Sequence, residues 1–217
     1  MKAVTSDTPG QPVLVVGVAG HRPDGLGSAD ETRLRNRVRS VLLLLRKADN
    51  NATLISPIAE GADRLVAHQA LAAGIPLICL LPFARDVYIK DFTTQASVED
   101  YRALLDRAQS VRELTGVHGS DGERDTAYAA LSDALVGEIH VLIAIWDGNE
   151  ARGIGGTGHS VDAALRRNIP VVWIDAHPPH EVRVLTQAGG SQTAYQALGS
   201  LPALLATREK TDRSSPL

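Results

Sequence analysis

The sequence predicts an α/β fold in which helices cover both faces of an open parallel sheet. Short apolar runs rich in β-branched residues alternate along the chain with longer amphipathic stretches, and this alternation is typical of βαβ units. The joins Gly74-Ile75-Pro76 and Asn168-Ile169-Pro170 repeat one arrangement, in which a residue that ends a helix precedes a proline that opens a strand. Such connections lead into parallel strands after a helical crossover.

The first part of the chain is expected to form three strands and two helices. Residues 13–18 are continuously apolar, as in a strand buried on both faces. Ser28 and Glu31 have the spacing of a capping box, and apolar residues recur at helical spacing after them, which predicts a helix over 29–48. The remaining elements expected here are a strand at 53–56, a helix at 61–73 that stops at Gly74, and a strand at 76–81.

The alternation continues beyond residue 82 and weakens after residue 175. The second strong strand is expected at 139–146, followed by a loop at 147–158. Glu181 to Leu185 suggest an edge strand, and 192–206 suggest a helix that docks on the sheet. The other expected elements are a loop at 83–95, a helix at 98–109, a weak strand at 111–115, a helix at 124–136, a helix at 159–167 and a strand at 171–175.

Length and composition indicate one globular domain, expected at 12–206, with flexible tails at 1–11 and 207–217. The chain has 217 residues, 22 of them basic and 25 acidic, so that its net charge is −3, and 44% are apolar. That apolar fraction excludes a wholly disordered chain, and the slightly acidic balance argues against a broad nucleic-acid-binding surface. The single cysteine, Cys79, lies in an apolar run and indicates a core thiol.

No apolar stretch approaches the ~18–20 residues that span a bilayer, and the polar N-terminus lacks the apolar segment of a signal peptide. We therefore expect a cytoplasmic protein without a membrane partner. The seven histidines form no convincing metal-ligand spacing, so neither a metal nor another cofactor is expected.

In open parallel sheets, ligands bind outside the carboxyl ends of the strands. The first loop in such a position carries Gly20, His21 and Arg22. The glycine lets the backbone approach a ligand, and the planar guanidinium suits phosphate or carboxylate. The alternative is a tight turn between strand and helix with Arg22 in solvent.

The second loop follows the strand at 53–56. Gly61 and Ala62 leave the next helix without a side-chain cap, and such a helix end binds anions. Glu60 could accept a hydrogen bond from a ribose hydroxyl or act as a general base. The candidate ligand contacts of this loop are Glu60, Gly61, Ala62, Asp63 and Arg64. In the alternative interpretation Glu60 caps the helix, Asp63 complements its dipole, and Arg64 pairs with either carboxylate.

The third loop is rich in glycine and opens the helix at 159–167. Consecutive glycines allow backbone amides to close on a phosphate, and Thr157 or Ser160 can add a hydroxyl donor. Glycines cost about 0.5–1 kcal/mol each relative to alanine in regular structure, so a plain surface loop, which is the alternative, gains little from them. The candidate ligand contacts of this loop are Asp147, Gly148, Gly155, Gly156, Thr157, Gly158 and Ser160.

Three other patterns have competing interpretations. Gly153, Gly155 and Gly158 fit the G-x-G-x-x-G dinucleotide fingerprint, with Asp175 about 20 residues on, but they do not follow their strand directly. Phe83, Tyr88 and Phe92 could stack on a base, although we favour a plug at the edge of the sheet. The third pattern is a run of alternating arginines that fall on two sides of their helix and suggest solvated faces, namely Arg33, Arg35, Arg37 and Arg39.

The three loops together resemble one superfamily. The segments that carry the resemblance are GVAGHRP, SPIAEGADRLVAHQAL with GIPLICLLPF, and VLIAIWDG with ARGIGGTGHSVDAAL. They look like the SLOG superfamily, which unites the DNA-processing protein DprA, the LOG phosphoribohydrolases and many inferred nucleotide sensors. The resemblance spans roughly 13–175. It implies a Rossmann-like fold, a nucleotide-derived ligand and, by analogy with LOG relatives, a homodimer.

The LOG motif P-G-G-x-G-T-x-x-E can be laid on the third loop. In this chain the carboxylate of the motif is Asp162, one methylene shorter than the glutamate of the pattern. By this resemblance Asp162 is a candidate catalytic group. The other matches are Gly155, Gly156 and Gly158 for the glycines, Ile154 for the proline and His159 for the threonine.

Three functional hypotheses follow. The first is a binding module whose crevice holds a nucleotide-like ligand, with phosphate at Gly155 and Gly156 and ribose near Glu60 or Asp162. The second is a LOG-like phosphoribohydrolase that cleaves the N-glycosidic bond of a nucleoside monophosphate, with Asp162 or Glu60 as acid/base. The third, by resemblance to DprA, is single-stranded DNA binding, which the acidic balance disfavours.

Overall fold

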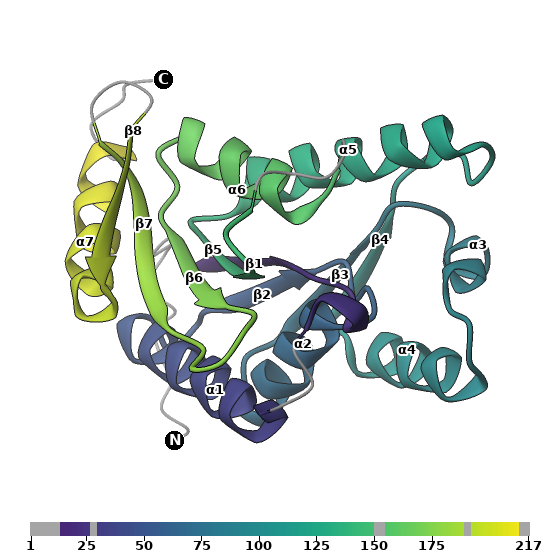
Figure 1. Cartoon of the computed structure of the whole chain (residues 1–217), viewed down its shortest axis with the longest axis horizontal. Helices are drawn as coiled ribbons and strands as arrows, with labels where there is room; N and C mark the ends of the chain where they lie inside the picture. Colours follow the sequence, from purple (N-terminus) through teal and green to yellow (C-terminus); the bar gives the residue numbers. More distant parts are fainter. Residues whose placement is uncertain (1–13, 27–29, 150–154, 189–191, 213–217) are drawn as a thin grey trace, which may run out of the picture.

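The computed structural model describes residues 14–26, 30–149, 155–188 and 192–212. These residues form an eight-stranded sheet of order β4-β3-β2-β1-β5-β6-β7-β8 (Figure 1). The pairs from β4 to β6 are parallel, and β7 and β8 are added antiparallel. The strands are β1 (Val15–Gly20), β2 (Thr53–Ser56), β3 (Leu77–Leu81), β4 (Ser110–Glu113), β5 (Val141–Trp146), β6 (Val171–Asp175), β7 (Val182–Ala188) and β8 (Gln192–Ala197).

Helices cover both faces of the sheet, which confirms the predicted α/β class. In Figure 1, α5 and α6 lie on one side of the sheet, and α1 and α2 lie on the other. The helices are α1 (Glu31–Ala48), α2 (Ala62–Ala72), α3 (Arg85–Tyr88), α4 (Gln95–Arg107), α5 (Asp121–Glu138), α6 (Thr157–Arg166) and α7 (Leu201–Asp212), with short 3-10 turns η1 (Pro23–Gly25), η3 (Ile89–Asp91) and η4 (Leu198–Ser200).

Successive side chains of β1 enter two different cores because neighbouring residues of a strand point to opposite faces. Val16 and Val18 are buried against the layer that holds α1 and α2, whereas Ala19 is buried with α5 and α6. Since β1 lies between β2 and β5, the chain order reverses at β1. Sheets of this kind leave a crevice at the carboxyl ends of the strands that flank such a reversal.

Helix α1 buries the apolar stripe that the sequence pattern predicts, including Leu34, Val38 and Leu45. The Asp30 side chain caps it by accepting a hydrogen bond from the backbone N–H of Arg33. Ser28, the expected capping residue, lies outside the described residues. The four alternating arginines of this helix are exposed, as the solvated-face interpretation requires.

The segment 83–95, predicted as a loop, contains α3 and η3. Phe83 and Tyr88 are fully buried, and the ring of Tyr88 lies 5.1 Å from that of Phe92. Burial of these rings fixes the short helix and supports the plug interpretation. Cys79 is also buried, and burial raises the pKa of its thiol to about 12, as expected of a core thiol.

The prediction of a docking helix over 192–206 is wrong for its first part. Residues Gln192–Ala197 form β8, which pairs antiparallel with β7 from Ala188↔Gln192 to Arg183↔Ala197. β8, rather than the segment around 181–185, is therefore the edge strand on this side. Pairing with β7 overrides the local pattern, and the helix starts only at Leu201 and extends to Asp212, inside the expected tail.

Candidate functional site

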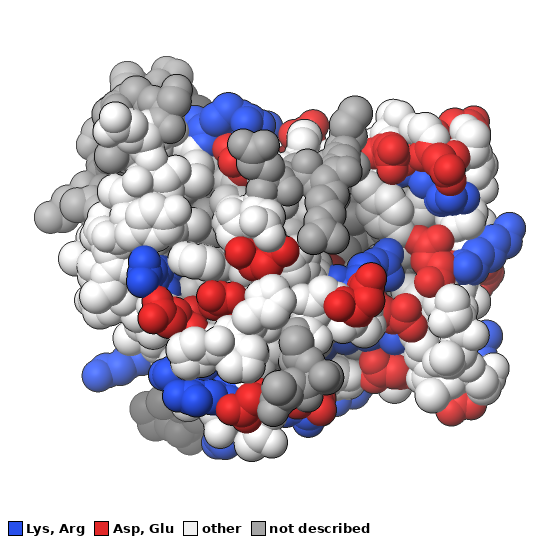
Figure 2. All heavy atoms as spheres, in the orientation of Figure 1, with Lys and Arg blue, Asp and Glu red and all other residues white. Residues whose placement is uncertain are grey.

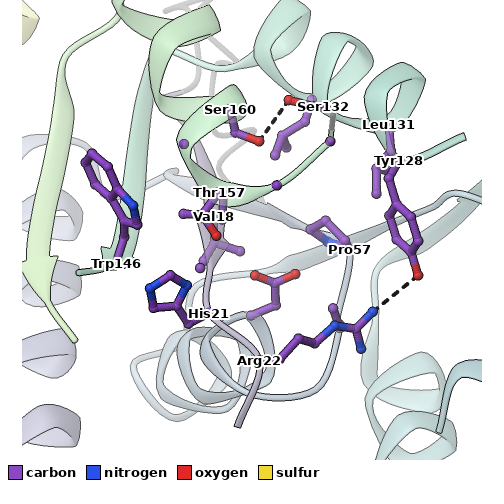
Figure 3. A pocket seen from close by; sticks show the side chains of 18 of the residues that line it. Val18, His21, Arg22, Pro57, Tyr128, Leu131, Ser132, Trp146, Thr157 and Ser160 are labelled. Atoms are coloured by element: carbon purple, nitrogen blue, oxygen red, sulfur yellow. Dashed lines mark hydrogen bonds between the residues drawn. The ribbon is translucent and has the colours of Figure 1, made fainter. Parts of the chain in front are cut away.

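A cavity of about 370 Å³ lies at the carboxyl ends of β1 and β5 (Figure 3). All three loops singled out in the sequence contribute to its walls, together with one face of α5. The residues that line it are Val18, Ala19, Gly20, His21, Arg22, Pro57, Ala59, Asp63, Tyr88, Tyr128, Leu131, Ser132, Leu135, Trp146, Asp147, Gly155, Gly156, Thr157, Gly158 and Ser160.

The loop after β1 is fixed on the first turn of α2. A Cβ on Gly20 would lie 2.3 Å from the Cβ of Ala62, and the N–H of His21 donates to the carbonyl of Ile145 at 3.0 Å. Gly61 has a φ of +95°, and a Cβ there would lie 2.4 Å from the His21 carbonyl oxygen. That oxygen accepts the N–H of Ala62 at 3.0 Å, so this amide of α2 is already used within the protein.

The N-terminus of α6 opens onto the cavity. Gly156 is its N-cap residue, and within the described ranges no side chain caps the helix. Gly155 has a φ of +83°, and a Cβ there would lie 2.7 Å from the Cβ of Tyr128, so only glycine lets the loop pack on α5. The free amides and the dipole of a helix start attract anions, and Gly156, Thr157 and Gly158 line the cavity.

Arg22 is held by side chains from two other elements. Its Nη2 donates to the Tyr128 hydroxyl at 3.2 Å (Figure 3). The same nitrogen lies 4.0 Å from Oδ2 of Asp91. The Tyr128 hydroxyl donates to the same Asp91 oxygen, and burial together with this bond raises the pKa of Tyr128. His118 Nε2 lies 2.7 Å from the other Asp91 oxygen. Arg22 thus lines the cavity and is tied to Tyr128, while its contact with a ligand stays a prediction.

Two buried polar groups of the cavity have no hydrogen-bond partner among the described residues. They are Oδ1 of Asp63, whose residue is 5% exposed, and the hydroxyl of Tyr88, whose residue is fully buried. Burial raises the pKa of Asp63 to about 7, although the charge of Arg22 and a hydrogen bond from the Ala59 amide act in the opposite direction. Burial also raises the pKa of Tyr88, which keeps its hydroxyl protonated.

His21 and Asp147 meet at the opposite wall. The backbone N–H of Asp147 donates to Nε2 of His21 at 3.2 Å. The Asp147 carboxylate folds its own loop by accepting the N–H of Asn149 at 3.0 Å. Burial raises the pKa of Asp147, but hydrogen bonds from Asn149 outweigh it and leave the pKa lowered. Gly148, with a φ of +81°, belongs to this turn and does not line the cavity.

Ser132 and Ser160 close the cavity between α5 and α6. Their hydroxyl oxygens are 2.8 Å apart and buried (Figure 3). Each therefore already has a hydrogen-bond partner.

Several sequence-predicted residues lie away from the cavity. Asp162 is exposed on α6. It lies two residues after Ser160, which lines the cavity, and at that spacing two side chains of a helix point to different faces. Glu60 is half-buried and does not line the cavity either. Asp175, the acidic residue of the dinucleotide pattern, accepts the backbone N–H of His177, and Gly153 of that pattern lies outside the described residues.

Arg64 has a packing role instead of the expected ligand contact. Its Nε donates to the Ile58 carbonyl at 3.0 Å and its Nη1 to the Ser97 carbonyl at 2.8 Å. The guanidinium lies 4.3 Å from the centre of the Phe92 ring. It therefore joins α2 to α4.

The site predicted from the sequence did not include α5, which forms one wall of the cavity. Tyr128 and Ser132 are four residues apart, on the same helical face as Leu131 and Leu135. The sequence does carry a signal for this wall, because Tyr128 and Ser132 are polar groups on an otherwise apolar face of the helix. Asp91 and Tyr88 fall in the segment predicted as a loop, where no periodicity could assign their direction.

No family model matches the chain, and no curated protein matches it. Solved structures do. DNA processing protein A (DprA) from Streptococcus pneumoniae superposes with a TM-score of 0.52 at 17% identity, over 75% of this chain and 50% of that chain. The fold is DprA-like. This likeness confirms the predicted Rossmann-like α/β fold, and the chain spans half the length of this DprA.

Two other structures are similar at lower scores. DprA from Helicobacter pylori, described for its single-stranded DNA binding mode, has a TM-score of 0.48 at 17% identity, over 90% of this chain and 73% of that chain. The protein TM1055 has a TM-score of 0.45 at 18% identity, over 73% and 72% of the two chains.

Two further findings concern membranes and metals. No helix in the described ranges is long and apolar enough to cross a membrane. The same residues contain no group of three or more His, Cys, Asp or Glu side chains arranged to hold a metal ion.

Proposed function

We propose that the chain binds a nucleotide or nucleotide-derived ligand in the cavity between the carboxyl ends of β1 and β5. One observation carries the proposal: the uncapped start of α6, the guanidinium of Arg22 and two unpartnered polar groups face one space. Its volume of about 370 Å³ lies within the usual range of small-molecule sites.

The phosphate is assigned to the amides at the start of α6. Gly156, Thr157 and Gly158 line the cavity there, and the helix dipole favours an anion at that end. The Ala62 amide of α2 donates to His21, so α6 is the better of the two predicted anion sites. Arg22 adds a positive charge on the same rim.

A LOG-like hydrolase is a second candidate because of Asp63. A general acid/base works best when its pKa is near the working pH, and burial raises the pKa of Asp63 to about 7. Asp162 and Glu60 lie outside the cavity lining. If the N-glycosidic bond of a nucleoside monophosphate is cleaved, we expect Asp63 to take the role first expected of Asp162 or Glu60.

The charge distribution favours a small ligand over nucleic acid. Acidic and basic side chains are interspersed on the face shown in Figure 2, and the net charge is −3. A homodimer and a cytoplasmic location remain expectations from the resemblance and the composition, and light scattering of the purified chain tests the first.

The test is a panel of nucleoside 5′-monophosphates, with the matching nucleosides and inorganic phosphate as controls. A ligand at 100 times its Kd stabilises the fold by about 2.7 kcal/mol, which raises Tm by roughly 5–11 °C for a chain of this size. Free base is measured in the same samples. A thermal shift without base release supports binding alone.

Base release that Asp63→Asn abolishes and Asp162→Asn retains supports the hydrolase. Absence of both a thermal shift and base release across the panel overturns the nucleotide proposal.

A further inference from the structure

Asp63 and Tyr88 bring two unused polar atoms into the same cavity from different elements. Asp63 is in the first turn of α2, and Tyr88 is the last residue of α3. Asp63 Oδ1 and the Tyr88 hydroxyl have no hydrogen-bond partner among the described residues, although both side chains are more than nine-tenths buried. Burying a polar group without a partner is unfavourable, so a ligand that supplies both partners accounts for them.

Packing alone does not explain the Tyr88 hydroxyl. The ring of Tyr88 lies 6.1 Å from that of Phe83 and 5.1 Å from that of Phe92, and a phenylalanine would make the same ring contacts. Three other hydroxyls of the cavity have partners: Ser132 contacts Ser160, and Tyr128 contacts Arg22 and Asp91. Of the buried side-chain atoms without a partner in the described ranges, those of cavity-lining residues belong to Asp63 and Tyr88.

The chemistry of the two groups restricts what they can bind. The Ala59 amide already bonds to the Asp63 carboxylate, so this side chain offers the free Oδ1 as an acceptor rather than a bidentate pair. Tyr88 can both donate and accept. The paired N–H groups on a base edge would favour two carboxylate oxygens, whereas a sugar hydroxyl, which donates and accepts, suits one acceptor beside a phenol.

We infer that Asp63 and Tyr88 bind the sugar hydroxyls of a ribonucleotide and make the cavity selective for ribose over deoxygenated sugars. The inference rests on the proposed nucleotide-binding function. It replaces the expectation that ribose lies near Glu60 or Asp162, which do not line the cavity. The phosphate remains at the start of α6, and apolar side chains of α5, among them Leu131, remain for the base.

Titration calorimetry tests the selectivity with ribonucleoside 5′-monophosphates and their 2′-deoxy and 2′,3′-dideoxy forms. Hydrogen bonds to a charged group correspond to about a 10- to 100-fold change in affinity. The wild-type protein should therefore bind the ribonucleotide about 10- to 100-fold more tightly than the dideoxy form. Equal affinities for the three sugars would overturn the inference while the binding itself upheld the proposed function.

Asp63→Asn and Tyr88→Phe test the two residues separately. Each should weaken ribonucleotide binding and leave the dideoxy affinity within about 2-fold, because only the hydroxyl contacts are lost. Tyr101→Phe is the matched control: Tyr101 packs on Tyr88, donates to the Arg85 carbonyl and does not line the cavity. This variant should retain the wild-type ribose preference.

Tyr88→Phe removes a hydroxyl without a partner, so its Tm without ligand should not fall, and a folded variant is available for the test. An undiminished ribose preference in both Asp63→Asn and Tyr88→Phe would reject the assignment. No binding of any of these phosphates to the wild-type protein would overturn the proposed function and this inference together.

Discussion

Arg22 and Tyr128 are joined by a hydrogen bond of 3.2 Å although 106 residues separate them in the sequence. The bond links the loop after β1 to α5. The same loop contacts the first turn of α2, which packs on the opposite face of the sheet from α5. Asp91 accepts from Tyr128 and lies beside Arg22. The position of the guanidinium at the cavity therefore depends on side chains from two distant segments.

Tyr128→Phe should weaken nucleotide binding by about 5- to 10-fold, because one hydrogen bond that positions Arg22 is lost, at about 1 kcal/mol. Calorimetry with a nucleoside monophosphate measures the change. Tyr195→Phe, at an exposed tyrosine of β8, is the control. Wild-type affinity in Tyr128→Phe, together with loss of binding in Arg22→Ala, would mean that Asp91 alone suffices to position Arg22.

Gly156→Val should abolish the ligand-dependent thermal shift and change the Tm of the free protein little. The φ of Gly156 is −75°, which valine adopts, but its side chain would stand beside the amides at the start of α6. The control is Gly122→Val, since a Cβ at Gly122 meets nothing within 4 Å. A full ligand response in Gly156→Val would exclude this helix start as the phosphate contact.

The stability of the protein should depend on pH through Asp63. Its pKa is about 7 in the fold and about 3.9 in an unfolded chain. Between these values the folded chain keeps a proton that the unfolded chain has lost. Stability therefore falls as pH rises from about 4 to about 7, and this contribution is constant above that window.

Asp63→Asn should remove this dependence. The difference in free energy of unfolding between the variant and wild type should widen by at most about 1.4 kcal/mol per pH unit across the window. Urea denaturation at several pH values measures it, and Asp162→Asn at an exposed site should instead parallel the wild type. A constant difference for Asp63→Asn would mean that this carboxyl titrates normally.

Gly61→Ala should destabilise the fold by about 2–4 kcal/mol, since its φ is +95° and the new Cβ would lie 2.4 Å from the His21 carbonyl oxygen. Urea denaturation measures the loss. Gly199→Ala is the control, because a Cβ there meets nothing within 4 Å. If Gly61→Ala were as stable as the control, the backbone at Gly61 would lie farther from the His21 carbonyl than the 2.4 Å separation implies.

The sequence predicts the parallel part of the fold well because the residues that end its helices and strands lie next to those elements in the chain. The bounds expected for β2 and β6 agree with those observed, Thr53–Ser56 and Val171–Asp175, where turn residues or prolines flank β-branched runs. β8 could not be predicted in this way. Its residues are held by their pairing with β7, and a partner strand leaves no mark in the segment itself.

The candidate site, like the fold, could be predicted only in part. The meeting of the three loops could be predicted, since the carboxyl ends of parallel strands lie at one edge of a sheet. The choice among carboxylates could not, because it depends on helical phase: Asp63 turns into the cavity, whereas its neighbour Arg64 turns toward Ser97. Sequence alone does not fix where the first turn of α2 begins to within one residue.

The walls of the cavity come from residues as far apart as Val18 and Ser160. A growing chain therefore has no binding site until α6 has been made and docked on α5. The ligand then recognises only the finished fold, and by mass action it should slow proteolysis and deepen amide-exchange protection across both helical layers rather than at the loops alone.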